Sequence, residues 1–222
     1  LGLGPAQIRL LVAAGAAGAI AATFNAPIAG VMFAMEVILG SFAARSFGLV
    51  VIASVTSTAI SQAVLGREPA FRLIESFTLV SEWEFLLYLG LGVFTGLIAL
   101  AYVQSVYWFE DSFDAWKIPP FWKAMVGGLG VGAMGYFGSE HIFGVGHEGV
   151  ELALQGELAV GLMLGLVLLK MLATSVTLGA GGSGGVFAPA LFIGAMAGGA
   201  FGKMANGVFP ELTAPPGAYA LV

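Results

Sequence analysis

Residues 181–189 read Gly181-Gly182-Ser183-Gly184-Gly185-Val186-Phe187-Ala188-Pro189 and join two long apolar runs. Glycine removes side chains from the backbone, and proline is favoured in the first turn of a helix, so a helix is predicted to begin near Pro189. The first N–H groups of a helix have no partner within it and lie at the positive end of its dipole. Main-chain N–H groups in this stretch are therefore able to bind an anion without any full positive charge.

The composition indicates a membrane protein. Of the 222 residues, 59% are hydrophobic and only 9% are charged, and the mean hydropathy is +0.96. Soluble domains are about 25% charged, so this chain lacks the charge to cover a surface in water. A net charge of −5 with eight scattered Lys and Arg disfavours a nucleic-acid partner. The absence of cysteine and the two histidines disfavour a metal site, and no cofactor or catalytic residue is expected.

The apolar segments predict an all-α, polytopic membrane protein. We expect about six to eight segments near the ~20 residues that a spanning helix needs. Non-helical backbone at membrane depth survives only where it lines a cavity or is buried, and broken helices mark transport sites. The glycine run at 179–185 and the Asn25-Ala26-Pro27 break are such interruptions. The segments are residues 8–39 with that break, 47–65, 85–109, 121–137, 158–178 and 186–204.

Two motifs resemble the CLC family of chloride channels and chloride/proton exchangers. Gly185-Val186-Phe187-Ala188-Pro189 matches the GxFxP signature of that family, and the stretch from Phe24-Asn25-Ala26-Pro27 to Glu36 is similar to a second family segment. The resemblance runs over essentially the whole chain. It implies a CLC-like inverted-repeat architecture with broken and tilted helices, and a homodimer with one anion pathway per subunit. It also implies that the amides of Val186 and Phe187, with that of Gly185 beside them, bind chloride.

The chain is expected to be an internal part of a CLC-type transmembrane domain, with residues 1–222 drawn from both repeat halves. It begins at Leu1 and ends in an apolar run. The family's GSGIP motif, its GREGP motif with the gating glutamate, and its pathway tyrosine are absent from the sequence. Gly66-Arg67-Glu68-Pro69 is like a shortened GREGP, but it follows the FNAP segment in a polar stretch, so we interpret it as unrelated.

One position bears on the mechanism of transport. Many exchangers of the family carry a proton-transferring glutamate directly after the position that matches Glu36, and the residue here is Val37. Because valine carries no proton, we favour a voltage-gated-type chloride channel, with a proton-coupled exchanger as the alternative. Glu36 itself is either an intramembrane functional carboxylate or a helix-end residue in water or paired with Arg45, and the second reading is preferred.

Three further features of the sequence are candidates for a functional role. Lys170 is the one base in its apolar run; it either reaches to an interface or raises the positive potential near the anion route. Ser183 belongs to a G-x-S-G pattern that resembles the rhomboid intramembrane proteases, a remote alternative because no histidine follows it. Residues 138–156 are expected to form a loop, in which His141 and His147 are either a pH sensor or, as we prefer, solvated side chains. A purely structural subunit is a last alternative, and a bacterial inner membrane is the expected location.

Overall fold

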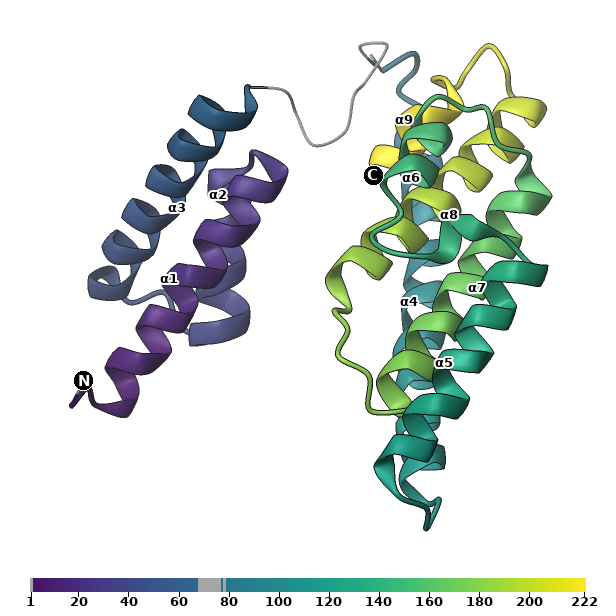
Figure 1. The fold of residues 1–222 in the computed structure, drawn as a ribbon. Coiled ribbons are helices and arrows are strands. Elements are labelled where there is room, and N and C mark those ends of the chain that lie inside the picture. The colour runs from purple at the N-terminus through teal and green to yellow at the C-terminus, as the bar shows by residue number, and fades with distance from the viewer. Residues whose placement is uncertain (1, 68–76, 78) are drawn as a thin grey trace. The chain divides into compact units, whose positions relative to one another are not determined.

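The computed structural model describes residues 2–67, 77 and 79–222, and for Arg45 the backbone alone. This part of the chain is helical throughout its regular structure (Figure 1), which confirms the all-α fold with broken helices. The elements are α1 (Pro5–Phe24), α2 (Pro27–Phe33), the π-helical η1 (Ala34–Leu39), α3 (Ala44–Leu65), α4 (Glu84–Asp114), α5 (Pro120–Phe137), the 3-10 helix η2 (Glu140–Ile142), α6 (His147–Leu154), α7 (Val160–Gly179), α8 (Phe187–Val208) and α9 (Pro216–Leu221).

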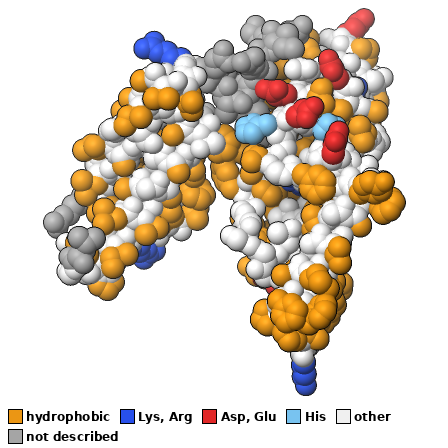
Figure 2. Space-filling view, in the orientation of Figure 1, with side chains coloured by type: hydrophobic (Ala, Val, Ile, Leu, Met, Phe, Trp, Pro, Cys, Tyr) orange, Lys and Arg blue, Asp and Glu red, His pale blue; other side chains and the backbone are white. Residues whose placement is uncertain are grey.

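The chain forms two compact units, unit 1 (Leu1–Arg72) and unit 2 (Leu73–Val222). Five described helices are long and apolar enough to cross a membrane, namely α1, α3, α4, α7 and α8. This is fewer than the six to eight spans expected from sequence. The run at 27–39 is too short, and α5 carries Lys123 and several glycines that lower its hydropathy. In Figure 2 hydrophobic side chains cover much of the long helices, while acidic and histidine side chains gather at one end of unit 2.

The break between α1 and α2 is built into the sequence of unit 1. Asn25 adopts the left-handed conformation with φ 52°, and Pro27 opens α2 as its first residue. Polar side chains of α3 form hydrogen bonds with residues on both sides of the break, and Ser61 Oγ donates to the Ala22 carbonyl at 3.1 Å. Gln62 Nε2 donates to Asn25 Oδ1 at 2.7 Å, and Ser54 Oγ donates to the Pro27 carbonyl at 2.8 Å. Such side-chain contacts are what allow an interrupted helix to persist in lipid.

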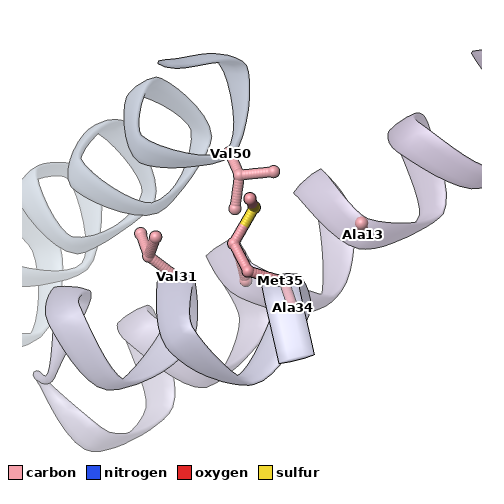
Figure 3. Packing of buried hydrophobic residues seen from close by; sticks show 6 residues of the cluster. Ala13, Val31, Ala34, Met35 and Val50 are labelled. Carbon is pink, nitrogen blue, oxygen red and sulfur yellow. The ribbon is translucent and has the colours of Figure 1, made fainter. Parts of the chain in front are cut away.

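Small residues bring the helices of unit 1 into close contact. A Cβ atom on Gly30 would lie 2.4 Å from the carbonyl oxygen of Ala17, so α1 and α2 approach at a distance that only glycine permits. The buried cluster beside this contact joins residues of α1, α2, η1 and α3 (Figure 3). It consists of Ala13, Ala17, Val31, Ala34, Met35 and Val50.

In unit 2 the helices α4, α7 and α8 pack against one another, and α5 packs on α7. Ser105 of α4 and Ser175 of α7 share a hydrogen bond of 2.8 Å between their hydroxyl groups. A Cβ atom on Gly127 of α5 would lie 2.3 Å from the Cβ atom of Ala180, just after α7. Small residues thus allow close packing at this helix contact.

Glu84 is fully buried at the start of α4. Its carboxylate accepts hydrogen bonds from the amide of Val80 at 3.0 Å, from the amide of Ala214, and from the hydroxyl of Tyr219 at 3.0 Å. Burial and the bond to Glu84 raise the pKa of Tyr219 well above its ordinary value, so its hydroxyl remains a donor. Glu84 thereby joins the start of α4, the segment after α8, and α9.

Replacing Glu84 with glutamine is expected to destabilise the protein by about 3 kcal/mol, because an amide cannot accept from all three donors. The matched control is Glu82→Gln, since Glu82 is exposed two residues away. Thermal unfolding of the detergent-solubilised protein measures both. Equal stability of the two variants would contradict the role assigned to Glu84.

Candidate functional site

The first glycines of the 179–185 run end α7. Gly181 has φ +82°, a left-handed conformation that glycine adopts without strain. Its N–H donates to the carbonyl of Leu178 at 2.9 Å, and the N–H of Gly182 donates to the carbonyl of Thr177 at 2.9 Å. These two bonds form a Schellman motif, which satisfies the last carbonyls of α7 and turns the chain sharply away from the helix.

The next residues leave their main-chain N–H groups exposed. Residues 183–186 are all exposed, and in the part of the chain that the structure describes their amides donate no hydrogen bond. The helix α8 then begins at Phe187, where Ala190 N donates to the Val186 carbonyl at 3.0 Å. Pro189 lies in the first turn, as predicted. The sequence 183–186 thus presents consecutive free donors at the positive end of a 22-residue helix.

The helix α8 begins part-way along unit 2. In Figure 1 the connection leaves the end of α7 and runs back beside the bundle, so the first turn of α8 lies within the length of α4 and α7. The axis of α8 is tilted against α4 in the same view. A helix start inside a bundle of spanning helices is the arrangement found at binding sites of broken-helix transporters.

A cavity of about 360 Å³ adjoins the turn. Ser183, Gly184 and Gly185 line it together with the first turn of α8. Lys170 and the polar face of α7 form a second wall, and the 142–145 segment forms a third. The structure therefore brings three predicted site residues, Lys170, Ser183 and Gly185, around one cavity. Val186 and Phe187 follow directly and are 52% and 41% exposed.

Lys170 is 2% exposed and is held inside unit 2. Its Nζ atom donates to the carbonyl of Ile142 at 2.7 Å and to the carbonyl of Gly144 at 2.8 Å. The ammonium also lies 5.0 Å from the ring centroid of Phe192 on α8, within the range of a cation–π interaction. These contacts fix its position at the wall of the cavity.

The segment 138–156, predicted as a loop, contains η2 and α6 instead. His147 begins α6, and the αL conformation of Gly146 before it makes the turn. His141 and His147 line a second cavity of about 320 Å³ with Glu140 and Glu148. Among the residues that the structure describes, no three His, Cys, Asp or Glu side chains are grouped to hold a metal ion.

The remaining candidates belong to unit 1. Glu36 and Val37 lie exposed in η1, and Arg9 Nε donates to the carbonyl of Ile38 at 2.9 Å near the end of that element. The expected pairing of Glu36 with Arg45 lies outside the described part of the structure, because only the backbone of Arg45 is described. Likewise, Glu68 and Pro69 of the 66–69 motif lie outside the described residues.

Sequence reasoning missed three residues that line the cavity. Thr174 and Thr177 lie four and seven residues after Lys170, a spacing that places all three on one face of α7. That spacing was a readable signal. Phe143 also lines the cavity, and it lines the histidine cavity too. Its place depends on the fold of the 138–146 segment, which no local pattern indicated.

Spanning helices, two breaks in them, and a cavity walled by main-chain amides define an integral membrane protein of the broken-helix kind. The sequence model of the voltage gated chloride channel family matches residues 1–222, and the chain belongs to this family.

Curated relatives agree with this assignment. The chain is 36% identical to "chloride channel protein CLC-f" of Arabidopsis thaliana, over 96% of this chain and 29% of that protein. It is 32% identical to a ClcB-like protein of Ralstonia nicotianae, over 97% and 50% of the two chains. It is 30% identical to "voltage-gated ClC-type chloride channel ClcB" of Escherichia coli, over 91% and 48%. The chain thus spans between 29% and 50% of the length of these relatives.

Substituting Gly181 with alanine is expected to cost about 1–2 kcal/mol of stability, because an L-residue is strained at φ +82°. Gly161→Ala in α7 is the control, since open space surrounds that position and alanine favours a helix. Thermal unfolding in detergent compares the two variants. A Gly181→Ala protein as stable as the control would show that the Schellman turn does not hold.

Proposed function

We propose that the chain forms part of a transmembrane pathway for chloride and similar small anions. The observation that carries the proposal is the run of unpartnered amides at residues 183–186, at the start of α8 and beside a cavity within unit 2. Membership of the voltage gated chloride channel family and the names of the relatives support it. No cofactor takes part, and chloride is the cargo.

The chemistry of main-chain amides suits conduction. An N–H group carries only a partial positive charge. A set of such groups therefore binds an anion less tightly than an arginine or lysine side chain in direct contact with the anion would. Conduction requires binding that is favourable enough for entry and weak enough for exit. We assign the anion site to the amides of Gly185, Val186 and Phe187, with Ser183 and Lys170 at the rim.

Within the family we propose a voltage-gated-type channel rather than a proton-coupled exchanger. The support is Val37, whose side chain cannot transfer a proton, at the position where many exchangers carry glutamate. Glu36 precedes it in the exposed π-helical η1, and π-helical turns are frequent at functional sites.

The serine-protease alternative has no support. The comparisons point to the voltage gated chloride channel family, and in the described part of the chain no base lies within hydrogen-bond reach of the Ser183 hydroxyl.

We further propose that the protein acts as a homodimer in a bacterial inner membrane. The support is the family resemblance, together with the bacterial sources of two of the relatives. Chemical cross-linking of the protein in native membranes tests the dimer, since a dimer gives one band of doubled mass and a monomer gives none.

Crystals of the intact protein grown with bromide are expected to show anomalous density beside the main-chain nitrogens between Gly185 and Phe187. Bromide has the charge of chloride and nearly its size, so it reports the same site. Parallel crystals without bromide provide the control. The assignment fails when the soaked crystals show density elsewhere in the protein and none at these nitrogens.

The intact protein in liposomes is expected to release chloride with little accompanying proton movement, because Val37 offers no proton carrier. A chloride electrode and a pH electrode record both ions in one vessel. Val37→Glu provides the matched variant for any gain of proton movement. Uphill proton transport by the unaltered protein, driven by a chloride gradient at fixed stoichiometry, would instead establish an exchanger.

A further inference from the structure

Lys170 is a buried charge without an acidic partner. Both of its hydrogen bonds go to neutral carbonyl groups, those of Ile142 and Gly144. Among the residues that the structure describes, no Asp or Glu forms an ion pair with it. Phe192 contributes only the weak attraction of its ring. The positive charge therefore remains uncompensated at the wall of the 360 Å³ cavity.

An uncompensated ammonium inside a membrane protein is costly, and such residues almost always face a functional cavity. Lys203 shows the contrast within the same unit. It donates to the carbonyl of Leu158 at 2.8 Å, but it is only half-buried and does not line the cavity. Lys170 alone of these two places its charge beside the glycine turn, where an anion would supply the missing counter-charge.

We infer that Lys170 is the fixed positive charge of the anion site, setting how strongly the cavity attracts anions and how well it excludes cations. This inference rests on the proposed function. The two carbonyls occupy two of the three N–H donors of the ammonium and so keep it from contacting the anion directly. The ammonium acts on the anion through its electrostatic field within the cavity, while the amides of the turn make the direct contacts. Such a division gives attraction without a tight ion pair, as conduction requires.

The first experiment separates charge from hydrogen bonding at position 170. Lys170→Gln removes the charge but keeps donors for the two carbonyls, Lys170→Arg keeps the charge, and Lys203→Gln is the control. Chloride affinity is measured by isothermal titration of the intact protein, and anion-over-cation selectivity by reversal potentials in planar bilayers. We expect Lys170→Gln to lose about tenfold in affinity and to gain cation leak, with the other two variants near the unaltered protein.

The second experiment leaves Lys170 in place and cancels its charge. Thr174 is buried one turn further along α7 and lines the same cavity. Thr174→Asp adds a counter-charge, and Thr174→Asn is its neutral match. We expect the aspartate variant to bind chloride about tenfold more weakly than the asparagine variant. If Lys170→Gln does not fold, the two Thr174 variants still test whether the charge of Lys170 attracts the anion.

The outcomes distinguish the two proposals. Equal chloride affinity for Thr174→Asp and Thr174→Asn, or an unchanged Lys170→Gln, overturns the inference about Lys170 while anion transport stands. An unaltered protein that neither binds nor conducts chloride overturns the proposed function itself. If Lys170→Arg loses as much chloride affinity as Lys170→Gln does, this also counts against a role for the charge. Such a result would mean that the shape of the side chain, and not its charge, matters at this position.

Discussion

Main-chain N–H and C=O groups at membrane depth need partners, and this constraint shapes every interruption of the helices. At the end of α1 a side chain of α3 helps to meet it, because Ser61 Oγ donates to the carbonyl of Ala22 at 3.1 Å. At the end of α7 the Schellman motif meets it for the carbonyls. At the second interruption, the amides of residues 183–186 donate no hydrogen bond within the described part of the chain, and Ser183, Gly184 and Gly185 line a cavity. The combination of free amides and a cavity is why we assign the anion to this interruption.

The parts of the fold that follow from local chemistry could be predicted from the sequence. Pro27 and Pro189 mark helix starts because their fixed φ suits a first turn, and the glycine run marks the end of α7 because Gly181 adopts a positive φ. The apolar runs predicted the first and last residues of the long helices to within a few positions. The 138–156 segment was assigned wrongly because its short helices carry mixed polar and apolar residues and are defined by tertiary contacts.

The burial of Glu84 and Lys170 could not be predicted for the same reason. Each side chain finds its partners on segments distant in sequence, at Ala214 and Tyr219 for the acid and at Ile142 and Gly144 for the base. Both ions are hydrogen-bonded to uncharged groups, two amides and a hydroxyl for Glu84 and two carbonyls for Lys170. They differ in their place, since Glu84 joins three segments of unit 2 whereas Lys170 lines the cavity at the glycine turn. Burial alone therefore does not separate a structural ion from a functional one, but the adjoining cavity does.

The two carbonyls bound by Lys170 flank Phe143, whose ring borders both the cavity at the glycine turn and the cavity at the histidines. The side chain is 48% exposed, and the tip of its ring lies against Gly135 of α5, where an added Cβ atom would clash with it. The main chain on both sides of Phe143 is held by hydrogen bonds to a charged group, each of about 1.5–3 kcal/mol. The backbone of this segment is therefore anchored, whereas the ring turns about its own side-chain bonds without breaking either hydrogen bond.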